Sequence, residues 1–247
     1  MWPLDLHPLL ARLFAARGLA PADVAPLRLA DLAAPSALGG IRRACDLLCE
    51  AIAGQQRICV VGDFDCDGAT GTAVAVRGLR LLGANDVRYR VPNRLRDGYG
   101  LTVGLVESLA DSAPRLILTV DNGVACHAGI AAARERGIRV VVTDHHLPGA
   151  TLPDADAMVN PNVTQVDEGS QGSALFDLRT QDARMNALFP GKALAGVGVV
   201  FYLLLALRAR LYPGVHPDRE DHRATIPGRA LQKKRPDLSS LLDLVAL

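Results

Sequence analysis

The sequence lacks a long apolar run, a secretory signal and an excess of charge of either sign. The longest stretch without a charged residue, 193–207, has 15 residues, short of the roughly 20 needed to span a bilayer. The first ten residues, MWPLDLHPLL, contain no basic region followed by an apolar run and a small-residue cleavage site. We therefore expect a cytoplasmic protein without a membrane segment.

Lysine and arginine together number 27 and aspartate and glutamate 26, which leaves a net charge of +1. This balance excludes a protein that coats a polyanion, so any contact with nucleic acid must be local. Cysteine is also scarce, with an odd number of residues and no CxxC pair: Cys45, Cys49, Cys59, Cys66 and Cys126. We interpret these as reduced thiols, which excludes a disulfide scaffold.

Apolar residues, in contrast, make up 49% of the 247 residues, and charged residues 21%. A chain of this composition can bury a sizeable core, which excludes a disordered or collagen-like protein. The length allows one large domain or two small ones.

Short β-branched runs alternate with segments of helical character. The runs predict buried strands at 57–62, 86–91, 115–120, 138–143 and 157–160, and the segments between them predict helices at 69–82, 101–109 and 125–136. Near-continuous apolar strands joined by helices are typical of a parallel sheet with right-handed crossovers. The sequence therefore predicts an α/β fold with a doubly wound, mainly parallel sheet.

The segments around this pattern suggest three further regions. Helices at 8–17 and 41–53 predict an N-terminal helical cap over 1–56, ahead of a core at 57–211. Within that core, the polar stretch 163–188 shows no sustained period and predicts an inserted surface loop, followed by an apolar helix at 193–207. Residues 212–247 are expected to form a linker and the start of a helix. In that linker, the basic segment 219–235 is interpreted as solvated chain in preference to a DNA-binding patch.

Acidic and imidazole side chains follow directly after the predicted strands. They are Asp63, Asp65 and Asp67 in GDFDCDG, Asp121 in VDNG, Asp144, His145 and His146 in TDHH, and Asn160 in NPN. Ligands of open α/β sheets bind outside the carboxyl ends of the strands, where these residues would converge. So many carboxylates would repel one another unless cations neutralise them. The sequence therefore predicts a divalent metal site, with two ions as the preferred interpretation.

The residue types favour a particular metal and reaction. Carboxylates combined with histidine favour Mn²⁺ over Mg²⁺, because imidazole suits transition metals better. A pair of such ions activates water for phosphoester hydrolysis. An EF-hand loop is excluded, since Val74 stands where its twelfth-position glutamate should be, whereas an Asp-rich turn without metal stays open. No GxxxxGK[ST] nucleotide-binding loop is present.

In this order the three motifs resemble the DHH phosphoesterase superfamily. The segments VPNRLRDGYGL, TDHHLPG, VNPN and FPGKALAGVGVVFYLLLALR are similar to its RecJ family of single-strand-specific exonucleases. The resemblance implies a 5′→3′ exonuclease that uses Mn²⁺ or Mg²⁺ to degrade single-stranded DNA to mononucleotides in recombination and repair. It also implies single-stranded-DNA-binding protein and a RecQ-type helicase as partners.

The resemblance implies residue roles as well. Metal ligands would be Asp63, Asp65, Asp67, Asp121 and His145, and catalytic residues Asp65, Asp67, Asp144, His145 and His146. Asp144 and His146 would orient ligands or contact the phosphate. The DNA-binding candidates are Arg94, Arg96, Tyr99, Asn122, Asn160 and Lys192. Arginine pairs with phosphate and tyrosine stacks on bases, although a solvated loop, a core tyrosine or close helix packing would also explain some of them.

The chain departs from the family pattern in two places. About 26 residues separate NPN from FPGK, where the family has a short link. The family also continues beyond LLDLVAL into a further aspartate ligand and more domains, so the chain is expected to be a truncated catalytic core. Two alternatives therefore stay open: a phosphodiesterase for short oligonucleotides or cyclic dinucleotides, and an inactive DNA-binding module.

Overall fold

The computed structural model describes residues 6–21, 32–164, 174–213, 225–226, 229–230 and 235–245. The chain divides into two compact units, Met1–Ala33 and Ala34–Leu247, which are described separately. The described part of the first unit includes the helix α1 (Pro8–Ala16), which begins with a proline and is capped by His7, whose Nδ1 accepts the N–H of Leu9 at 3.2 Å. None of the α1 residues is buried.

The second unit is built on a five-stranded sheet in the order β2-β1-β3-β4-β5, and every neighbouring pair is parallel. The strands are β1 (Ile58–Val61), β2 (Val87–Arg90), β3 (Leu116–Val120), β4 (Arg139–Thr143) and β5 (Ala157–Val159). Every residue of the central strands β1 and β3 is buried, which explains their unbroken apolar sequence. The predicted parallel α/β fold is confirmed.

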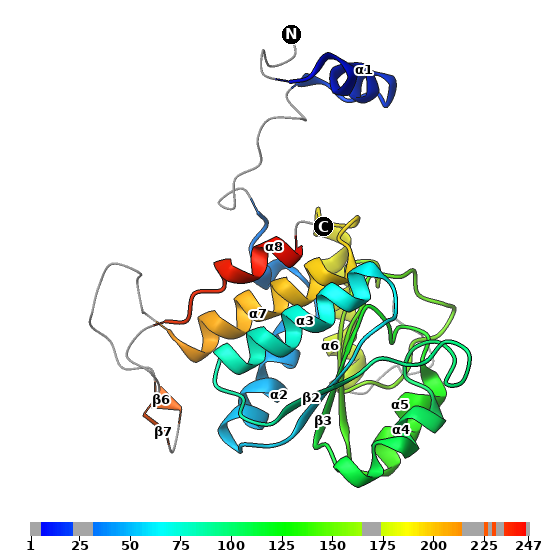
Figure 1. Cartoon of the computed structure of the whole chain (residues 1–247), viewed down its shortest axis with the longest axis vertical. Helices are drawn as coiled ribbons and strands as arrows, with labels where there is room; N and C mark the ends of the chain where they lie inside the picture. Colours follow the sequence, from blue (N-terminus) through cyan, green and yellow to red (C-terminus); the bar gives the residue numbers. More distant parts are fainter. Residues whose placement is uncertain are drawn as a thin grey trace. The chain divides into compact units, whose positions relative to one another are not determined.

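Helices cover both faces of the sheet (Figure 1). On one side α4 (Val103–Ser108) and α5 (His127–Glu135) pack over β1, β3 and β4 in an aliphatic cluster that includes Leu105 and Ile130. On the other lie α2 (Ile41–Ala53), α3 (Cys66–Leu81) and α7 (Gly196–Leu211), with the short α8 (Leu242–Val245) beside α3 and α7. Single 3-10 turns occupy Pro35–Ala37, Ala110–Ser112 and Ser239–Leu241.

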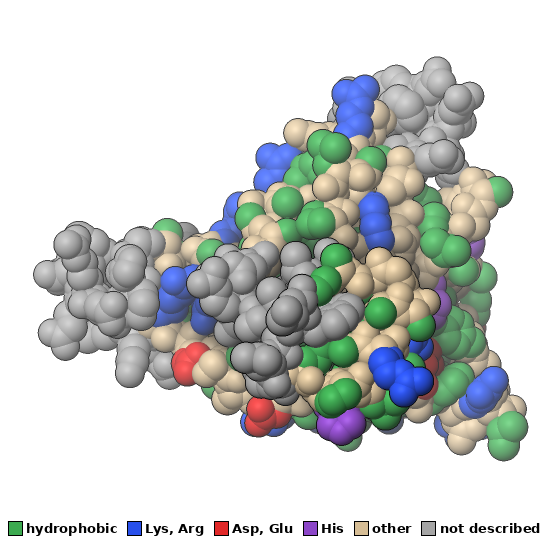
Figure 2. Space-filling view, turned by 90° about the horizontal axis from the view of Figure 1, so that it is seen from above, with side chains coloured by type: hydrophobic (Ala, Val, Ile, Leu, Met, Phe, Trp, Pro, Cys, Tyr) green, Lys and Arg blue, Asp and Glu red, His purple; other side chains and the backbone are tan. Residues whose placement is uncertain are grey.

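Lysine and arginine side chains do not gather in one patch on the face shown in Figure 2; they are dispersed among apolar and other polar side chains. The whole sequence has a net charge of only +1. Recognition of a polyanion by this chain would therefore depend on a few cations placed at a particular site.

The predicted domain boundaries stay predictions, but α2 packs against α7 and β5 and so belongs to the same compact unit as the sheet. The basic segment 219–235 lies almost entirely outside the described residues, apart from Arg235 and the paired strands β6 (Thr225–Ile226) and β7 (Arg229–Ala230). Among the described residues, no helix has both the length and the apolar character that crossing a membrane requires.

The prediction of a loop throughout 163–188 is wrong for its second part, because a helix, α6 (Ala174–Leu188), occupies it. Its residues lack an apolar period, so the helix was invisible in the sequence. Tertiary contacts hold it instead. The buried amide of Asn186 accepts the Gly39 N–H at 2.8 Å and donates to the carbonyls of Asn160 at 2.9 Å and Val163 at 3.0 Å.

Candidate metal centre

The first acidic motif forms the turn from β1 into α3. Asp65 caps α3, since its Oδ1 accepts the Gly68 N–H at 3.2 Å, and Asp67 lies in the first helical turn. Asp63 is buried ahead of them and accepts the Phe64 N–H at 2.7 Å. Asp67 also accepts the N–H of Gly196, the first residue of α7, at 3.0 Å. The N-termini of α3 and α7 therefore contact carboxylates of this motif. Negative charge is electrostatically favourable at a helix N-terminus.

Asp121 follows β3 in a left-handed backbone conformation, with φ at 64°. Its side chain is 1% exposed, and no backbone N–H group among the described residues donates to its carboxylate, whose one close polar partner is the His145 imidazole. The turn around it is held internally: Asn122 donates its amide to the carbonyls of Val61 at 3.1 Å and Val120 at 2.9 Å, and the Tyr99 hydroxyl donates to the Asp121 carbonyl at 3.1 Å. The polypeptide thus fixes the backbone of Asp121 but supplies no backbone donor to its carboxylate.

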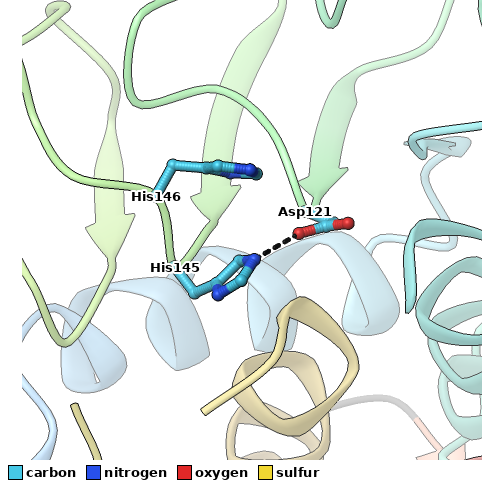
Figure 3. Close-up of side chains that lie close together, drawn as sticks. All are labelled: Asp121, His145 and His146. Carbon is cyan, nitrogen blue, oxygen red and sulfur yellow. Dashed lines mark ion pairs between the residues drawn. The ribbon is translucent and has the colours of Figure 1, made fainter. Parts of the chain in front are cut away.

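The third motif brings two imidazoles to the same place (Figure 3). The Nε2 atom of His145 lies 3.1 Å from Oδ1 of Asp121 and 3.6 Å from Oδ2 of Asp67. His146 contacts Asp144 through Nδ1 at 2.8 Å. The buried carboxylate of Asp144 accepts the N–H groups of Val124, His145 and His146, so it shapes the loop that carries both histidines.

The pKa values of the site follow from burial and these contacts. Burial raises the pKa of Asp121 to about 6, and the interaction with Asp121 raises the pKa of His145. The contact with Asp144 raises the pKa of His146 to about 9. Burial alone would raise the pKa of Asp144, but the bonds from His146 and Val124 outweigh it and the pKa is lowered.

Two groups of side chains could each hold a cation: Asp63, Asp65 and Asp121, and Asp121, His145 and His146. Within each group the ligand atoms lie within 4.8 Å of one another. Asp121 belongs to both groups, and its buried carboxylate, which no backbone N–H group satisfies, would hold a cation. Asp67 adjoins them through His145. The residues present therefore fit a two-cation centre of oxygen and imidazole ligands.

The family model described as the DHH family, N-terminal domain, matches residues 57–227. The chain belongs to the DHH family. The match begins one residue before β1 and includes all three acidic motifs.

Curated relatives of this DHH chain are single-stranded-DNA-specific exonucleases named RecJ. The Dickeya dadantii protein is 46% identical over 245 residues, which are 99% of this chain and 37% of the relative. The Escherichia coli protein is 42% identical, with the same coverage of both. The chain thus spans just over a third of the length of the curated relatives it matches.

Two solved structures of exonuclease RecJ share the fold of the DHH chain. A crystal structure of exonuclease RecJ bound to manganese matches with a TM-score of 0.56 and 40% identity, covering 73% of this chain and 40% of that one. RecJ from Thermus thermophilus in complex with Mn²⁺ matches with a TM-score of 0.57 and 36% identity, covering 87% of this chain and 27% of that one.

Some DNA-binding candidates of the DHH chain lie beside the centre. Arg94 and Tyr99 border an open pocket of about 710 Å³ that Asp63, Asp65 and His146 also line. Arg94 lies over the Phe64 ring, 5.2 Å from its centroid, and Tyr99 packs edge-on against Phe64 and His146. Arg96 is exposed and pairs with Asp97 at 2.8 Å.

The other candidates are engaged inside the protein. Asn122 and Asn160 have no exposed surface, and the Asn160 amide donates to the His146 carbonyl at 2.9 Å. The ammonium group of Lys192 donates to the carbonyls of Pro161, at 2.6 Å, and Asn186. The buried amides of Asn122 and Asn160 therefore support the site from within, whereas Lys192 is partly exposed and stays a predicted DNA contact. Strand-end position alone could not distinguish the two asparagines from exposed residues.

Sequence reasoning missed two residues that support the centre. Asn162 donates its amide to the His145 carbonyl at 2.6 Å, although only the first asparagine of NPN was predicted to matter. Gly196 lies so close to Asp121 that an added Cβ would come within 2.3 Å of its Oδ1. The sequence shows a glycine at the start of the apolar helix, but it does not show that Asp121 packs against this glycine.

Proposed function

We propose that this chain carries the metal-dependent hydrolytic site of a 5′→3′ exonuclease that degrades single-stranded DNA to 5′-mononucleotides in recombination and repair. The observation that carries the proposal is the buried Asp121 carboxylate, which no backbone N–H group satisfies and which belongs to both groups of possible ligands. The names of the relatives support the substrate, and the manganese-bound structures support the cofactor.

The cofactor of the proposed enzyme is Mn²⁺ or Mg²⁺, as two ions. Asp63, Asp65, Asp67, Asp121 and His145 would hold it. Bound there, the ions supply activation of a water molecule and stabilisation of the charge on the leaving oxygen.

The chain's own side chains would bind and orient the substrate. His146 and Arg94 both line the open pocket and would contact phosphate oxygens there. Tyr99 lies between Phe64 and His146 at the pocket wall, where its exposed surface can stack on a base. Asp65 and Asp67 act as ligands in this proposal, and Asp144 acts by positioning both histidines.

The experiment combines metal binding with hydrolysis. Calorimetry with Mn²⁺ on chelator-stripped chain is expected to show two ions per chain, and 5′-labelled single strands are expected to release mononucleotides faster than duplexes. Asp65→Ala and His145→Ala should each lower turnover by more than the roughly 10- to 100-fold cost of losing an outer partner of a metal ligand. Glu107→Gln, which removes an exposed carboxylate on α4, is the matched control and should behave as the unmodified chain.

Unchanged turnover in both alanine variants would refute the assigned site. Preference for dinucleotides over long strands would shift the assignment to a short-oligonucleotide phosphodiesterase. Tight metal binding without any hydrolysis would favour an inactive binding module.

We further propose a cytoplasmic location, with single-stranded-DNA-binding protein and a RecQ-type helicase as partners. The proposal of both partners is based on the resemblance to the RecJ family. Co-purification with each candidate tests them, and absence of either complex would remove that partner.

A further inference from the structure

The outer edge of the sheet at β2 carries exposed cations and an exposed aromatic ring. Tyr89 is 60% exposed, and its ring makes no aromatic contact with described residues. Arg88 and Arg90 flank it and are also exposed. Around this edge lies a cavity of about 510 Å³, lined by Arg57, Arg80, Arg88, Arg90, Tyr89 and Asp111 among others.

Positive charge at this edge is only partly balanced. One carboxylate, Asp86, serves two guanidinium groups, those of Arg57 at 2.6 Å and Arg88 at 2.8 Å. Arg80 donates to a neutral acceptor, the Val87 carbonyl, at 2.8 Å. The guanidinium group of Arg90 makes no hydrogen bond or ion pair with the described residues. The cavity lining holds four arginines and one carboxylate, that of Asp111, so an anionic ligand would meet net positive charge here.

The same contacts disfavour pairing of β2 with another strand. The carbonyls of Asp86 and Arg90 face β1 and accept the N–H groups of Ile58 and Gly62. On the outer side, Arg80 occupies the Val87 carbonyl, and charged arginine side chains along a short edge strand disfavour its pairing with another strand. The surface thus suits a ligand recognised by charge and stacking.

The β2 edge is continuous with the candidate metal centre. Tyr89 is level with Val60 and Arg90 with Val61 in the parallel register. Asp63 lies three residues beyond Val60, which corresponds to about 10 Å along the strand direction. From Arg90 the chain runs directly into the loop that carries Arg94 and Tyr99 at the pocket. A ligand that follows β2 would pass from Arg90 to Arg94 and so reach the candidate metal centre.

We infer that the β2 edge is a second binding surface for single-stranded polynucleotide, on which Arg88 and Arg90 contact phosphates and Tyr89 stacks on a base. Strand alternation places the Tyr89 ring on one side of the edge and the two guanidinium groups on the other. The phosphates of the bound strand and its stacked base would therefore contact different sides of β2. This inference rests on the proposed function only in taking its ligand to be a single strand.

The test is equilibrium binding of fluorescent oligothymidylates of about 4 and 16 nucleotides, with chelator present so that no hydrolysis occurs. Tyr89→Ala is expected to weaken binding of the longer strand by about 5- to 150-fold, the range for loss of one stacked base. Tyr89→Trp should retain affinity. Arg90→Ala should reduce the slope of log affinity against log salt by about 0.7, the value for one lost phosphate contact.

The control is Arg43→Ala, which removes an exposed arginine of α2 that has no described hydrogen-bond or ion-pair partner. It should leave both affinity and slope unchanged, and thermal unfolding of each variant verifies folding. The inference would be overturned if neither Tyr89→Ala nor Arg90→Ala changed the affinity for the longer strand. It would also be overturned if these variants changed the oligomeric state of the chain but not its affinity for the strand. The binding assay contains no metal, so a negative result in it is distinct from a negative result in the hydrolysis assay, which requires metal.

Discussion

At the scale of single residues, Asp121 combines a left-handed backbone with a buried carboxylate whose one close polar partner among the described residues is His145. Burying a charge is costly, and the raised pKa of Asp121 shows that burial outweighs the contact with His145. Asparagine tolerates the left-handed region better than most residues, so Asp121→Asn changes the charge with little effect on the backbone.

Without metal, this residue should make stability depend on pH. The folded pKa is about 6, above the ordinary value of 3.8, so the folded chain retains a proton that the unfolded chain has lost. Stability should therefore fall as pH rises from about 4 to about 6, by at most about 3 kcal/mol. Asp121→Asn should reduce this slope in urea unfolding with chelator present, whereas Glu107→Gln should preserve it. An unchanged slope in Asp121→Asn would show that the carboxylate is not buried as described.

Residue types identified the candidates, but not their partners. The acids at the strand ends were visible because they interrupt apolar runs, as Asp63 and Asp121 do. That Asp144 faces backbone N–H groups, while Asp121 faces none, depends on turn geometry that the sequence does not encode locally. The inward amides of Asn122 and Asn160 escaped prediction for the same reason.

At the scale of secondary-structure elements, the start of α7 closes the centre. The Gly196 N–H meets Asp67, and its missing side chain gives room to Asp121. The strands and most helices were predictable, because burial on both faces imposes β-branched runs and one-sided burial imposes helical periods. The helix α6 was not, since the contacts of Asn186 with segments distant in sequence hold it in place.

A pair of glycine substitutions tests this arrangement. Gly196→Ala should destabilise the chain and weaken Mn²⁺ binding, because its Cβ would displace the Asp121 carboxylate. Gly104→Ala, in α4 where no atom lies within 4 Å of the added Cβ, should stabilise by roughly 0.5–1 kcal/mol. Calorimetric metal titration and chemical unfolding measure both effects. Equal metal affinity in the two variants would contradict the assigned role of the α7 start.

At the scale of the whole molecule, the chain consists of a sheet-containing unit from Ala34 onward and a separate unit before it. The sequence predicted a cap ending at residue 56, because both early helices precede the first strand. The apolar face of α2 is nevertheless buried in the second unit, with residues that include Leu47, Leu48 and Ile52.

Two deletions distinguish these divisions. Removing residues 1–33 should shift Tm by less than the roughly 2–4 °C that corresponds to 1 kcal/mol in a chain of this size. Removing residues 1–56 should abolish cooperative unfolding, because α2 is lost from the core. Thermal unfolding followed by circular dichroism measures both. If the chain without residues 1–56 still unfolded cooperatively, the predicted domain boundary at residue 56 would be supported.

The candidate ligands from Asp63 to His145 follow three different strands, β1, β3 and β4, joined by long crossovers. Contacts of such wide separation in sequence form late in folding. An ion at this centre would therefore recognise the assembled sheet and not its precursors. It would act on the rate of unfolding and leave the rate of folding almost unchanged, so that metal would lengthen the lifetime of the native state.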